Sequence, residues 1–301
     1  MNTPKKIVIL GAAESGVGSA VLAQKLSMEV FVSDAGKIAD KYKKELVSRG
    51  IRFEEGSHTE SEILSADEII KSPGIPDKAP LVKKAKAQGI KIISEIEFAA
   101  RYTDAKIIAI TGTNGKTTTT MLTYHILQKA GMNVGLGGNV GKSFARQVAE
   151  ENFDHYVLEL SSFQLDGCYE FKADIGILTN ITPDHLDRYD YQLQNYVDSK
   201  FRILQNQTAA DAFIYCADDE LTMNEIAKLN PGMQLYPFSI YKKEGMSAWV
   251  EEEQLYIQTN NQQLNMSIHD LALQGKHNLY NSMASGIASR ILDIRKDVVR
   301  E

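Results

Sequence analysis

The sequence predicts an α/β protein built from two domains. The first observation is alternation, because short β-branched runs such as KIVIL and EVFVSD precede stretches with helical periodicity, as parallel strands with crossover helices do. The second is that this series starts twice, near residues 6 and 106, each time as strand, glycine-containing turn and helix. The third is the length of 301 residues, which suits two domains of ordinary size. We therefore expect domains at 1–102 and 103–301.

The elements can be placed in order along the chain. In the first series, the strand KIVILG leads into the helical GVGSAVLAQKL, and EVFVSD, EIIKSPG and IKIISEIEFAARY follow. In the second, an apolar strand at Lys106–Ile110 leads into a helix that begins near Lys116, and β-branched runs follow in MNVGLGG, HYVLELSS, ADIGILTNI and AFIYCADD. Helices are expected over Tyr191–Asn206 and in GKHNLYNSMASGIASRIL. The alternating stretch AWVEEEQLYIQTNNQQLNMSI predicts an antiparallel hairpin at the edge of the second domain.

Composition excludes several classes of partner. A formal charge of -6 argues against nucleic acid or an anionic membrane as a partner, because both select for clustered lysine and arginine. No run approaches the ~20 apolar residues of a membrane span. Cys168 and Cys216 are too few for a disulfide framework, so we expect two buried apolar residues in a reducing cytoplasm. A small molecule or a protein remains as the expected partner.

The first glycine-bearing turn, GAAESG at 11–16, resembles a dinucleotide-binding turn only in part. It follows a strand and precedes a helix, and the N-terminus of a helix attracts anions. The middle glycine of that fingerprint, which lets the backbone approach a pyrophosphate, is replaced by Ala13. Asp34, at the end of the next strand, could accept hydrogen bonds from a ribose or a base. A plain strand-to-helix turn stays open as the alternative.

The second turn, TGTNGKTT, carries the chemical parts of a phosphate-binding loop. Gly112 and Gly115 permit a sharp backbone, Lys116 can reach the β- and γ-phosphates, and the Thr117 hydroxyl can bind Mg²⁺. Only two residues separate the glycines, where the usual P-loop has four. The alternative is a threonine-rich helix cap. Because the turn lies between a strand and a helix, whose dipole favours negative charge, the sequence favours ATP.

Acidic and histidine side chains follow other strands of the second domain. Glu159 lies in the apolar run YVLELSSFQL, where a buried carboxylate costs several kcal/mol unless a cation or metal compensates it. The loop TNITPDHLDRYD places Asp184, His185 and Asp187 after another strand. Ligands of open α/β sheets bind at the carboxyl ends of strands, so these groups are expected to converge with the second turn. His185 alone would be read as a surface residue; beside Glu159 and Thr117, metal ligation is favoured.

Two further positions allow a functional and a plain interpretation. Lys200, in YVDSKFRIL, is either a solvated charge or, after CO₂ adds to its neutral amine, a carbamate that binds a metal. The carbamate requires a desolvated site, because little lysine is neutral at pH 7. Asn278 and Asn281 lie three residues apart, on one face of the last helix, and could read an adenine edge. Asn278 could instead be the N-cap of that helix.

The motifs TGTNGKTT, LELSSFQL, TNITPDHLDRYD, SKFRI and GKHNLYN, in this order and spacing, resemble the Mur ligases of peptidoglycan synthesis. The residues within these motifs are most similar to those of the family member that adds D-glutamate. The resemblance covers nearly the whole chain and implies three domains: a Rossmann-like domain for the UDP portion, a P-loop-like, mostly parallel three-layer α/β domain for ATP, and a C-terminal domain for the amino acid. This chain is expected to lack the third domain, and therefore to bind its UDP substrate with negligible ligation.

The resemblance also implies an activity and its residues. ATP would phosphorylate the carboxylate of UDP-N-acetylmuramoyl-L-alanine, and the amine of D-glutamate would attack the acyl phosphate, in a cytoplasmic monomer. Two Mg²⁺ ions would be held by Thr117 and Glu159 and by His185 and carbamylated Lys200, with Lys116, His185 and Lys200 as catalytic residues. The implied ATP-binding residues are Gly112, Thr113, Asn114, Gly115, Lys116, Thr117, Thr118, Asn278 and Asn281. The implied substrate-binding residues are Ser15, Asp34, Gly74, Asn139, Ser161 and His185.

Two other functions stay open at this point. A folylpolyglutamate-synthase-like ligase shares the short phosphate loop, but such an enzyme would not carry a separate Rossmann unit ahead of it, and here about a hundred residues precede the loop. An NAD-dependent oxidoreductase would use GAAESG, against which Ala13 counts.

Overall fold

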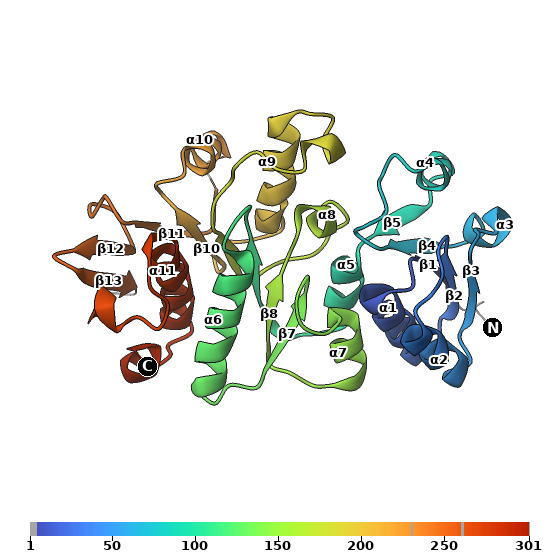
Figure 1. The fold of residues 1–301 in the computed structure, drawn as a ribbon, viewed down its shortest axis with the longest axis horizontal. Coiled ribbons are helices and arrows are strands. Elements are labelled where there is room, and N and C mark those ends of the chain that lie inside the picture. The colour runs from blue at the N-terminus through green and yellow to red at the C-terminus, as the bar shows by residue number, and fades with distance from the viewer. Residues whose placement is uncertain (1–4, 230, 260–261, 301) are drawn as a thin grey trace. The chain divides into compact units, whose positions relative to one another are not determined.

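The computed structural model describes residues 5–229, 231–259 and 262–300, and it confirms the α/β class. The described chain forms two compact units, each with its own sheet (Figure 1). The first unit contains the described residues up to Asp104, and also Gly141–Asn152 and Phe163–Phe171. The second contains Ala105–Val140, Phe153–Ser162 and the described residues from Lys172 onward. Two short stretches beyond residue 103 therefore pack with the first unit. A single boundary in the sequence does not separate the two units.

The first unit is built on a parallel five-stranded sheet with the strand order β3-β2-β1-β4-β5. Its β-branched strands are buried, and Ile7, Val8 and Ile9 of the central strand are fully inaccessible, as expected for a parallel sheet covered on both faces. The elements are β1 (Lys6–Leu10), α1 (Glu14–Lys25), β2 (Glu29–Asp34), α2 (Asp40–Ser48), β3 (Arg52–Glu55), α3 (Glu60–Ile63), β4 (Glu68–Lys71), α4 (Pro80–Ala87), β5 (Lys91–Ile93), α5 (Glu95–Ala100), α7 (Phe144–Glu150) and most of α8 (Ser162–Leu165).

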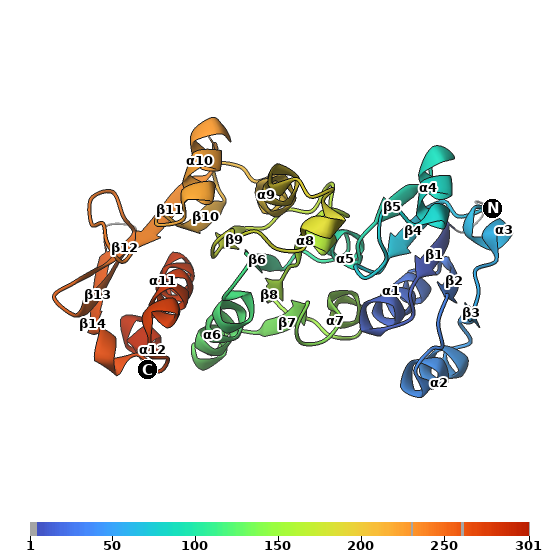
Figure 2. The same cartoon turned by 45° about the horizontal axis from the view of Figure 1, so that its top comes forward.

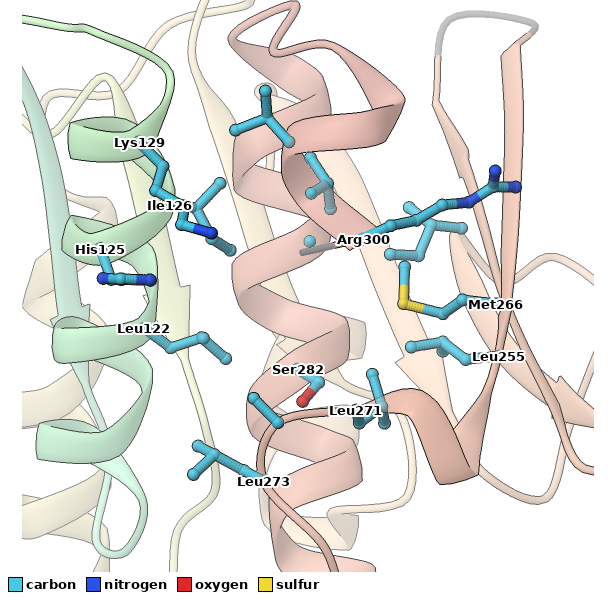
Figure 3. A pocket seen from close by; sticks show the side chains of 15 residues that line it. Leu122, His125, Ile126, Lys129, Leu255, Met266, Leu271, Leu273, Ser282 and Arg300 are labelled. Atoms are coloured by element: carbon cyan, nitrogen blue, oxygen red, sulfur yellow. The ribbon is translucent and has the colours of Figure 1, made fainter.

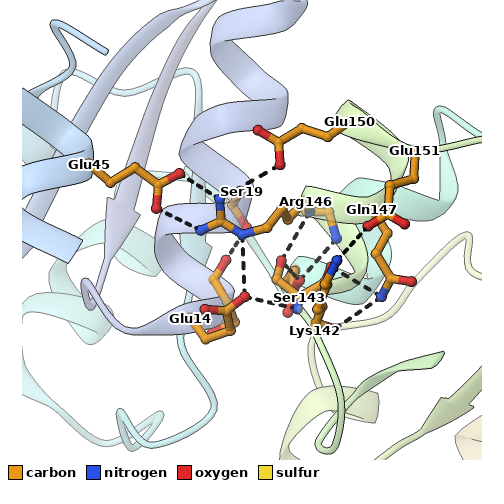
Figure 4. Close-up of polar contacts among 12 residues, drawn as sticks. Glu14, Ser19, Glu45, Lys142, Ser143, Arg146, Gln147, Glu150 and Glu151 are labelled. Carbon is orange, nitrogen blue, oxygen red and sulfur yellow. Dashed lines mark hydrogen bonds and ion pairs between the residues drawn. The ribbon is translucent and has the colours of Figure 1, made fainter. Parts of the chain in front are cut away.

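A charged network joins helix α7 to the rest of the first unit (Figure 4). The guanidinium of Arg146 donates to both carboxylate oxygens of Glu45 on α2, at 2.5 and 3.0 Å, and its Nε donates to Glu14 on α1 at 3.3 Å. This bidentate contact lowers the pKa of the Glu45 carboxyl. Ser143 caps α7, because its hydroxyl accepts the backbone N–H of Arg146 at 3.1 Å. These contacts explain why a segment far along the sequence belongs to this unit.

The second unit is built on a nine-stranded sheet with the order β14-β13-β12-β11-β10-β9-β6-β8-β7. Neighbouring strands from β12 to β7 are parallel, whereas β13 is antiparallel to both of its neighbours, β12 and β14. The elements are β6 (Lys106–Thr111), α6 (Lys116–Lys129), β7 (Val134–Gly138), β8 (His155–Glu159), β9 (Ile175–Leu178), α9 (Leu193–Phe201), β10 (Ala212–Cys216), α10 (Glu220–Leu229), β11 (Gln234–Ser239), β12 (Ala248–Glu251), β13 (Gln254–Thr259), β14 (Gln262–Ser267), α11 (Lys276–Ile291) and α12 (Lys296–Arg300).

The antiparallel edge predicted for the second domain is confirmed by β12, β13 and β14. The helix predicted over Tyr191–Asn206 is shorter than expected, because α9 begins at Leu193 and ends at Phe201, with a 3-10 turn after it. Asp190 and Tyr191 have φ values of 53° and 58°. Left-handed backbone of this kind cannot continue into an α-helix, so it delays the helix start.

Helices α6 and α11 pack side by side in the second unit (Figure 2). Hydroxyl groups meet between them, because Thr123 Oγ1 donates to Ser285 Oγ at 3.0 Å. Below the helices, fully buried residues such as Ile108 and Val157 form the apolar core, and burying a side chain of this size contributes about 1.5–3 kcal/mol. Cys168 and Cys216 are both buried, as expected. Among the described residues, no helix is long and apolar enough to cross a membrane.

Candidate functional site

Several of the predicted site residues of the second unit lie at or just after the carboxyl ends of adjacent strands. Strand β6 lies between β9 and β8, with Ile110 opposite Glu159 of β8 and Thr111 opposite Leu178 of β9. The turn after β6, the end of β8 and the loop after β9 therefore meet at one edge of the sheet, the edge at which open α/β sheets bind ligands. The convergence expected from the sequence is thus present in the fold.

The turn between β6 and α6 requires both of its glycines. Gly112 has φ 146°, and a β-carbon there would lie 1.9 Å from Thr179 Oγ1. Gly115 has φ 82° and is the N-cap of α6. The loop after β9 holds the turn in place, because Asn180 accepts the backbone N–H of Thr113 on its carbonyl at 2.8 Å and that of Asn114 on its side chain at 3.0 Å. The strand ends thus fix a turn whose following helix N-terminus favours an anion.

Two lysines donate to the carbonyls of this turn. Lys116 Nζ lies 2.9 Å from the carbonyl oxygen of Gly112 and 2.7 Å from that of Thr113. Burial lowers the pKa of the Lys116 ammonium, and the carboxylates of Glu159 and Asp184 oppose this effect. Lys200, on α9, is 2% exposed, and its Nζ lies 2.6 Å from the same Gly112 carbonyl. Its interpretation as a solvated surface charge is therefore wrong, and the desolvated setting is the one that a carbamate requires.

Only one of the two carboxylate oxygens of Glu159 accepts a hydrogen bond. Glu159 is 1% exposed, and the side-chain amide of Asn139, which follows β7, donates to its Oε1 at 2.8 Å. The other oxygen, Oε2, is buried without a hydrogen-bond partner. An unsatisfied buried carboxylate oxygen is costly, and it is the donor that Mg²⁺ prefers. The residues present therefore fit a cation at this position.

The remaining metal and phosphate candidates lie around the same strand ends. Thr117 is exposed on the first turn of α6, and Thr118, next to it, is partly buried. His185 has φ 51° and a 56% exposed side chain, and its Nε2 lies 3.5 Å from Asp184 Oδ2. Within the described residues, no three His, Cys, Asp or Glu side chains gather closely enough to hold a metal. Metal binding by His185 and by modified Lys200 stays a prediction.

The amide pair on α11 lies as predicted, but one interpretation of it is wrong. Asn281 Nδ2 donates to Asn278 Oδ1 at 3.1 Å, so the two side chains do share a face. The N-cap of α11 is Gly275, not Asn278, whose Nδ2 instead donates to the carbonyl of Gln274 at 2.9 Å. Asn281 also accepts from Thr119 Oγ1 on α6 at 3.1 Å. The pair therefore connects the start of α11 to the helix of the phosphate turn.

The first unit holds Ser15, Asp34 and Gly74, whereas Asn139, Ser161 and His185 lie in the second. Asp34 uses its carboxylate on the protein itself, since Oδ2 accepts the N–H of Ala12 and Oδ1 that of Gly36, each at 2.8 Å. It thereby shapes the turn after β1, a role that the sequence did not indicate. Ser15 is half-buried on the first turn of α1, and Gly74 is exposed in the loop after β4. Their proposed contacts with a substrate stay predictions.

Several residues of the site were missed by sequence reasoning. Thr179 and Asn180, which hold the phosphate turn, lie near the end of the predicted run ADIGILTNI and directly follow β9, and this position at a strand end was the available signal. Tyr196 places its hydroxyl 3.2 Å from Thr113 Oγ1 and its ring 4.6 Å from Lys200 Nζ. No pattern in the sequence pointed to Tyr196, because helical spacing alone does not show which element a side chain meets.

The fold and the site define an α/β protein whose second sheet carries a glycine–lysine–threonine turn beside a buried carboxylate. Residues 110–289 match the model described as the Mur ligase middle domain, and residues 5–94 match the Mur ligase MurD-like, N-terminal domain. The chain therefore belongs to the Mur ligase family, as the sequence motifs indicated.

Curated relatives agree with this assignment. The chain is 58% identical to UDP-N-acetylmuramoylalanine--D-glutamate ligase of Bacteroides fragilis and 59% identical to the protein of that name from Bacteroides thetaiotaomicron. In each case the alignment covers 99% of this chain and 67% of the relative. The chain thus spans about two thirds of the length of these relatives.

Solved structures show the same fold at much lower sequence identity. UDP-N-acetylmuramate:L-alanyl-gamma-D-glutamyl-meso-diaminopimelate ligase from Neisseria meningitides matches with a TM-score of 0.68 at 18% identity, covering 98% of this chain and 96% of that one. UDP-N-acetylmuramate-alanine ligase from Thermotoga maritima matches with a TM-score of 0.58 at 21% identity, covering 98% and 66%. At these identities the likeness concerns the fold alone.

Proposed function

We propose that this chain supplies the UDP-substrate-binding and ATP-binding parts of an ATP-dependent ligase that joins D-glutamate to UDP-N-acetylmuramoyl-L-alanine. The observation that carries the proposal is the phosphate turn after β6, which lies beside Glu159, a buried carboxylate with one oxygen that has no hydrogen-bond partner. It occurs in a chain 58% identical to a UDP-N-acetylmuramoylalanine--D-glutamate ligase. We assign the UDP portion to residues 1–102 and ATP to residues 103–301. We take the protein to act as a monomer in the cytoplasm, the compartment that holds ATP.

The proposed reaction requires that the carboxylate of UDP-N-acetylmuramoyl-L-alanine first be activated. A carboxylate resists nucleophiles, whereas its phosphate anhydride carries a good leaving group, so phosphoryl transfer from ATP would precede attack by the amine of D-glutamate. Both reacting groups are anions, and the transfer needs positive charge close to the phosphates. Lys116, already lying across the turn, is the residue that we assign to the β- and γ-phosphates. Bound Mg²⁺ would neutralise further charge on the phosphate oxygens.

We assign one Mg²⁺ to Glu159 and Thr117, because Glu159 offers a buried oxygen without a partner. We assign a second to His185 and carbamylated Lys200, supported by the burial of that lysine. The backbone of Gly112–Gly115 and the side chains of Thr117 and Thr118 would surround the phosphates, with Asn278 and Asn281 on the adenine side. Ser15, Asp34 and Gly74 are assigned to the uridine side, and Asn139, Ser161 and His185 to the muramoyl-alanine side.

Calorimetry tests the nucleotide and substrate assignments. We expect the chain to bind ATP in the presence of Mg²⁺, and Lys116→Ala to weaken that binding about tenfold or more, since a charge-assisted hydrogen bond is worth about 1.5–3 kcal/mol. UDP-N-acetylmuramoyl-L-alanine should bind the Lys116→Ala protein unchanged, which controls for folding. NADH, followed by its fluorescence, should not bind. Tight NADH binding without UDP-ligand binding would replace the proposal with an oxidoreductase.

The carbamate has its own test. The protein is incubated with ¹³C-labelled bicarbonate and Mg²⁺, and the ¹³C spectrum is recorded for the parent and for Lys200→Met. A carbamate carbonyl signal in the parent alone supports the assignment. A spectrum identical in both proteins removes Lys200 from the ligand set and leaves the ATP assignment standing.

A further inference from the structure

One side chain of α9, that of Tyr196, contacts both the phosphate turn and the buried lysine beside it. Its hydroxyl lies 3.2 Å from Thr113 Oγ1 in the turn, and the centroid of its ring lies 4.6 Å from Lys200 Nζ. Tyr196 is 2% exposed, so both contacts are shielded from water. The proposed reaction assigns no part to this tyrosine, although it touches two residues of the site.

The helix that follows the turn borders a cavity along part of its length, where its packing is incomplete. This cavity, of about 90 Å³, lies between α6, α11, α12 and the β13–β14 hairpin, and Leu122 and Ile126 of α6 line it (Figure 3). Leu122 lies six positions after Lys116, which places the cavity roughly 9 Å further along the helix axis than the start of α6. The contacts that fix the phosphate turn lie instead at the strand ends and on α9.

The number of available protons fixes the direction of the hydrogen bond between Tyr196 and Thr113. Thr113 Oγ1 accepts the backbone N–H of Thr182 at 3.0 Å and donates its only proton to the carbonyl of Thr182 at 3.1 Å. Tyr196 is therefore the donor in the third contact. Burial and the carboxylate of Asp184 raise the pKa of the Tyr196 phenol against the opposing effect of the Thr113 hydrogen bond, so the phenol keeps the proton that it donates.

The Thr113 hydroxyl thereby joins three parts of the second unit at one atom. It belongs to the turn after β6, Thr182 belongs to the loop after β9 that carries His185, and Tyr196 belongs to α9. A hydroxyl that donates once and accepts twice has no capacity left for another partner. These bonds therefore fix the position of the turn relative to the loop of His185.

The ring of Tyr196 acts on the same turn through Lys200. The Lys200 ammonium contacts both this ring and the carbonyl oxygen of Gly112, which lies 2.6 Å from Nζ. A desolvated cation is attracted to the face of an aromatic ring. The ring therefore helps to hold the ammonium at Gly112, the first residue of the turn, while the hydroxyl holds Thr113, the second.

We propose that Tyr196 is a positioning residue of the nucleotide site, which holds Thr113 directly and Gly112 through Lys200 in the geometry that receives the phosphates. The inference rests on the proposed binding of ATP, and it adds a role for a residue to which no contact with nucleotide or metal is assigned. Because Tyr196 acts on the phosphate turn, its loss should weaken every ligand that places a triphosphate there by the same factor, with or without a nucleoside.

The experiment is calorimetry in the presence of Mg²⁺ with two ligands, ATP and inorganic tripolyphosphate, which lacks the nucleoside. We expect Tyr196→Phe, which keeps the ring and removes the donor, to bind both ligands about two- to tenfold more weakly than the parent, the range for one neutral hydrogen bond. Tyr196→Leu removes the ring as well, and its affinity for both ligands should fall by a further factor of about two to thirty.

Tyr189→Phe is the matched control. Tyr189 is also buried, and its hydroxyl lies at the same distance of 3.2 Å from another hydroxyl, that of Ser199. That bond does not involve the turn, so its loss should lower the free energy of unfolding but leave the binding of both ligands unchanged. Hydrogen exchange of the peptide over 112–116, measured without ligand, should become about two- to tenfold faster in Tyr196→Phe and not in Tyr189→Phe.

The outcomes separate this inference from the proposed function. If Tyr196→Phe matches the parent in both affinities and in the exchange of the turn, the inference is overturned and the ATP assignment stands. An equal loss of affinity in Tyr189→Phe, or a loss for ATP alone, would also overturn it, because neither result is specific to the phosphate turn. A parent that binds neither ATP nor tripolyphosphate would overturn the ATP assignment, and the inference with it.

Discussion

The Nζ atom of Lys200 and the carbonyl oxygen of Gly112 are 2.6 Å apart, so a buried lysine of α9 supports the first residue of the phosphate turn. Water cannot replace this donor, because Lys200 is 2% exposed. We expect Lys200→Met, which keeps an apolar chain but no donor, to reduce the hydrogen-exchange protection of the turn about tenfold or more, since a charge-assisted bond is worth about 1.5–3 kcal/mol. Mass spectrometry of the peptide over 112–116 measures this.

The matched control for that variant is Lys228→Met. Lys228 is exposed on α10, where its Nζ pairs with the carboxylate of Glu225 at 2.9 Å. Its replacement should leave exchange over 112–116 unchanged. Equal protection of the turn in Lys200→Met and the parent would show that Lys116, which contacts the same carbonyl, holds the turn alone.

We expect the carboxylate of Glu159 to lower the free energy of unfolding when no cation is present and to strengthen cation binding. Its Oε2 is buried without a partner, so replacing the carboxylate by the neutral amide in Glu159→Gln should raise the free energy of unfolding by about 1–3 kcal/mol. The same change should weaken Mg²⁺-dependent ATP binding. Urea unfolding without Mg²⁺ and calorimetry with it measure the two effects. Glu244→Gln, at an exposed loop position, is the control, and a destabilised Glu159→Gln protein would contradict the argument.

Gly112 tests how tightly the turn is packed. A β-carbon at this position would lie 1.9 Å from Thr179 Oγ1, on a backbone with φ 146°. We expect Gly112→Ala to cost about 2 kcal/mol or more in unfolding free energy and to abolish detectable ATP binding. Gly232→Ala, where a β-carbon would meet nothing within 4 Å, serves as the matched change. If both variants unfold at the same urea concentration, the close approach at Gly112 is not a constraint.

Much of the fold could be predicted because local pattern and topology agree. The buried runs at Lys106–Thr111 and His155–Glu159 are apolar and β-branched, and the glycines of the phosphate turn mark where the strand ends. Strand β3 gave no such signal, since its sequence RFEE holds one apolar residue at the sheet edge. Pro237 likewise obscured β11, whose pairing with β10 is parallel. In both strands, the extended conformation is set by pairing with the neighbouring strand and not by the local sequence pattern.

The sequence indicated which residues belong to the candidate site, but not which other residues they contact. The sequence identified Glu159 as a buried charge that needed compensation, yet not that Asn139 would provide it. It left Lys200 open between two interpretations, because burial depends on which element packs over the helix. The attachment of Ser143 and Arg146 to the first unit depends on contacts with Glu95 and Glu45, which lie 48 and 101 positions earlier. Such pairings are set by three-dimensional packing, which a local pattern does not encode.

Glu95 gives the first unit a dependence on pH. The side chain is 3% exposed; its Oε1 accepts from the Ser143 hydroxyl and the Ala145 N–H, whereas Oε2 is buried without a partner. Burial raises the pKa of Glu95 to about 7, against the opposing effect of the Ser143 hydrogen bond. Between its ordinary pKa of 4.5 and about 7, the folded protein binds more protons than the unfolded chain.

The free energy of unfolding should therefore fall as the pH rises from about 4.5 to about 7, and remain lower above that range. The difference between the two pKa values corresponds to at most about 3 kcal/mol. Glu95→Gln cannot ionise, so it should be more stable than the parent at pH 8 by about 1–3 kcal/mol and lose most of that advantage at pH 5. Urea unfolding followed by circular dichroism at both pH values measures this, with Glu151→Gln on the same unit as control. An advantage of equal size at pH 5 and pH 8 would mean that Glu95 does not titrate in this range.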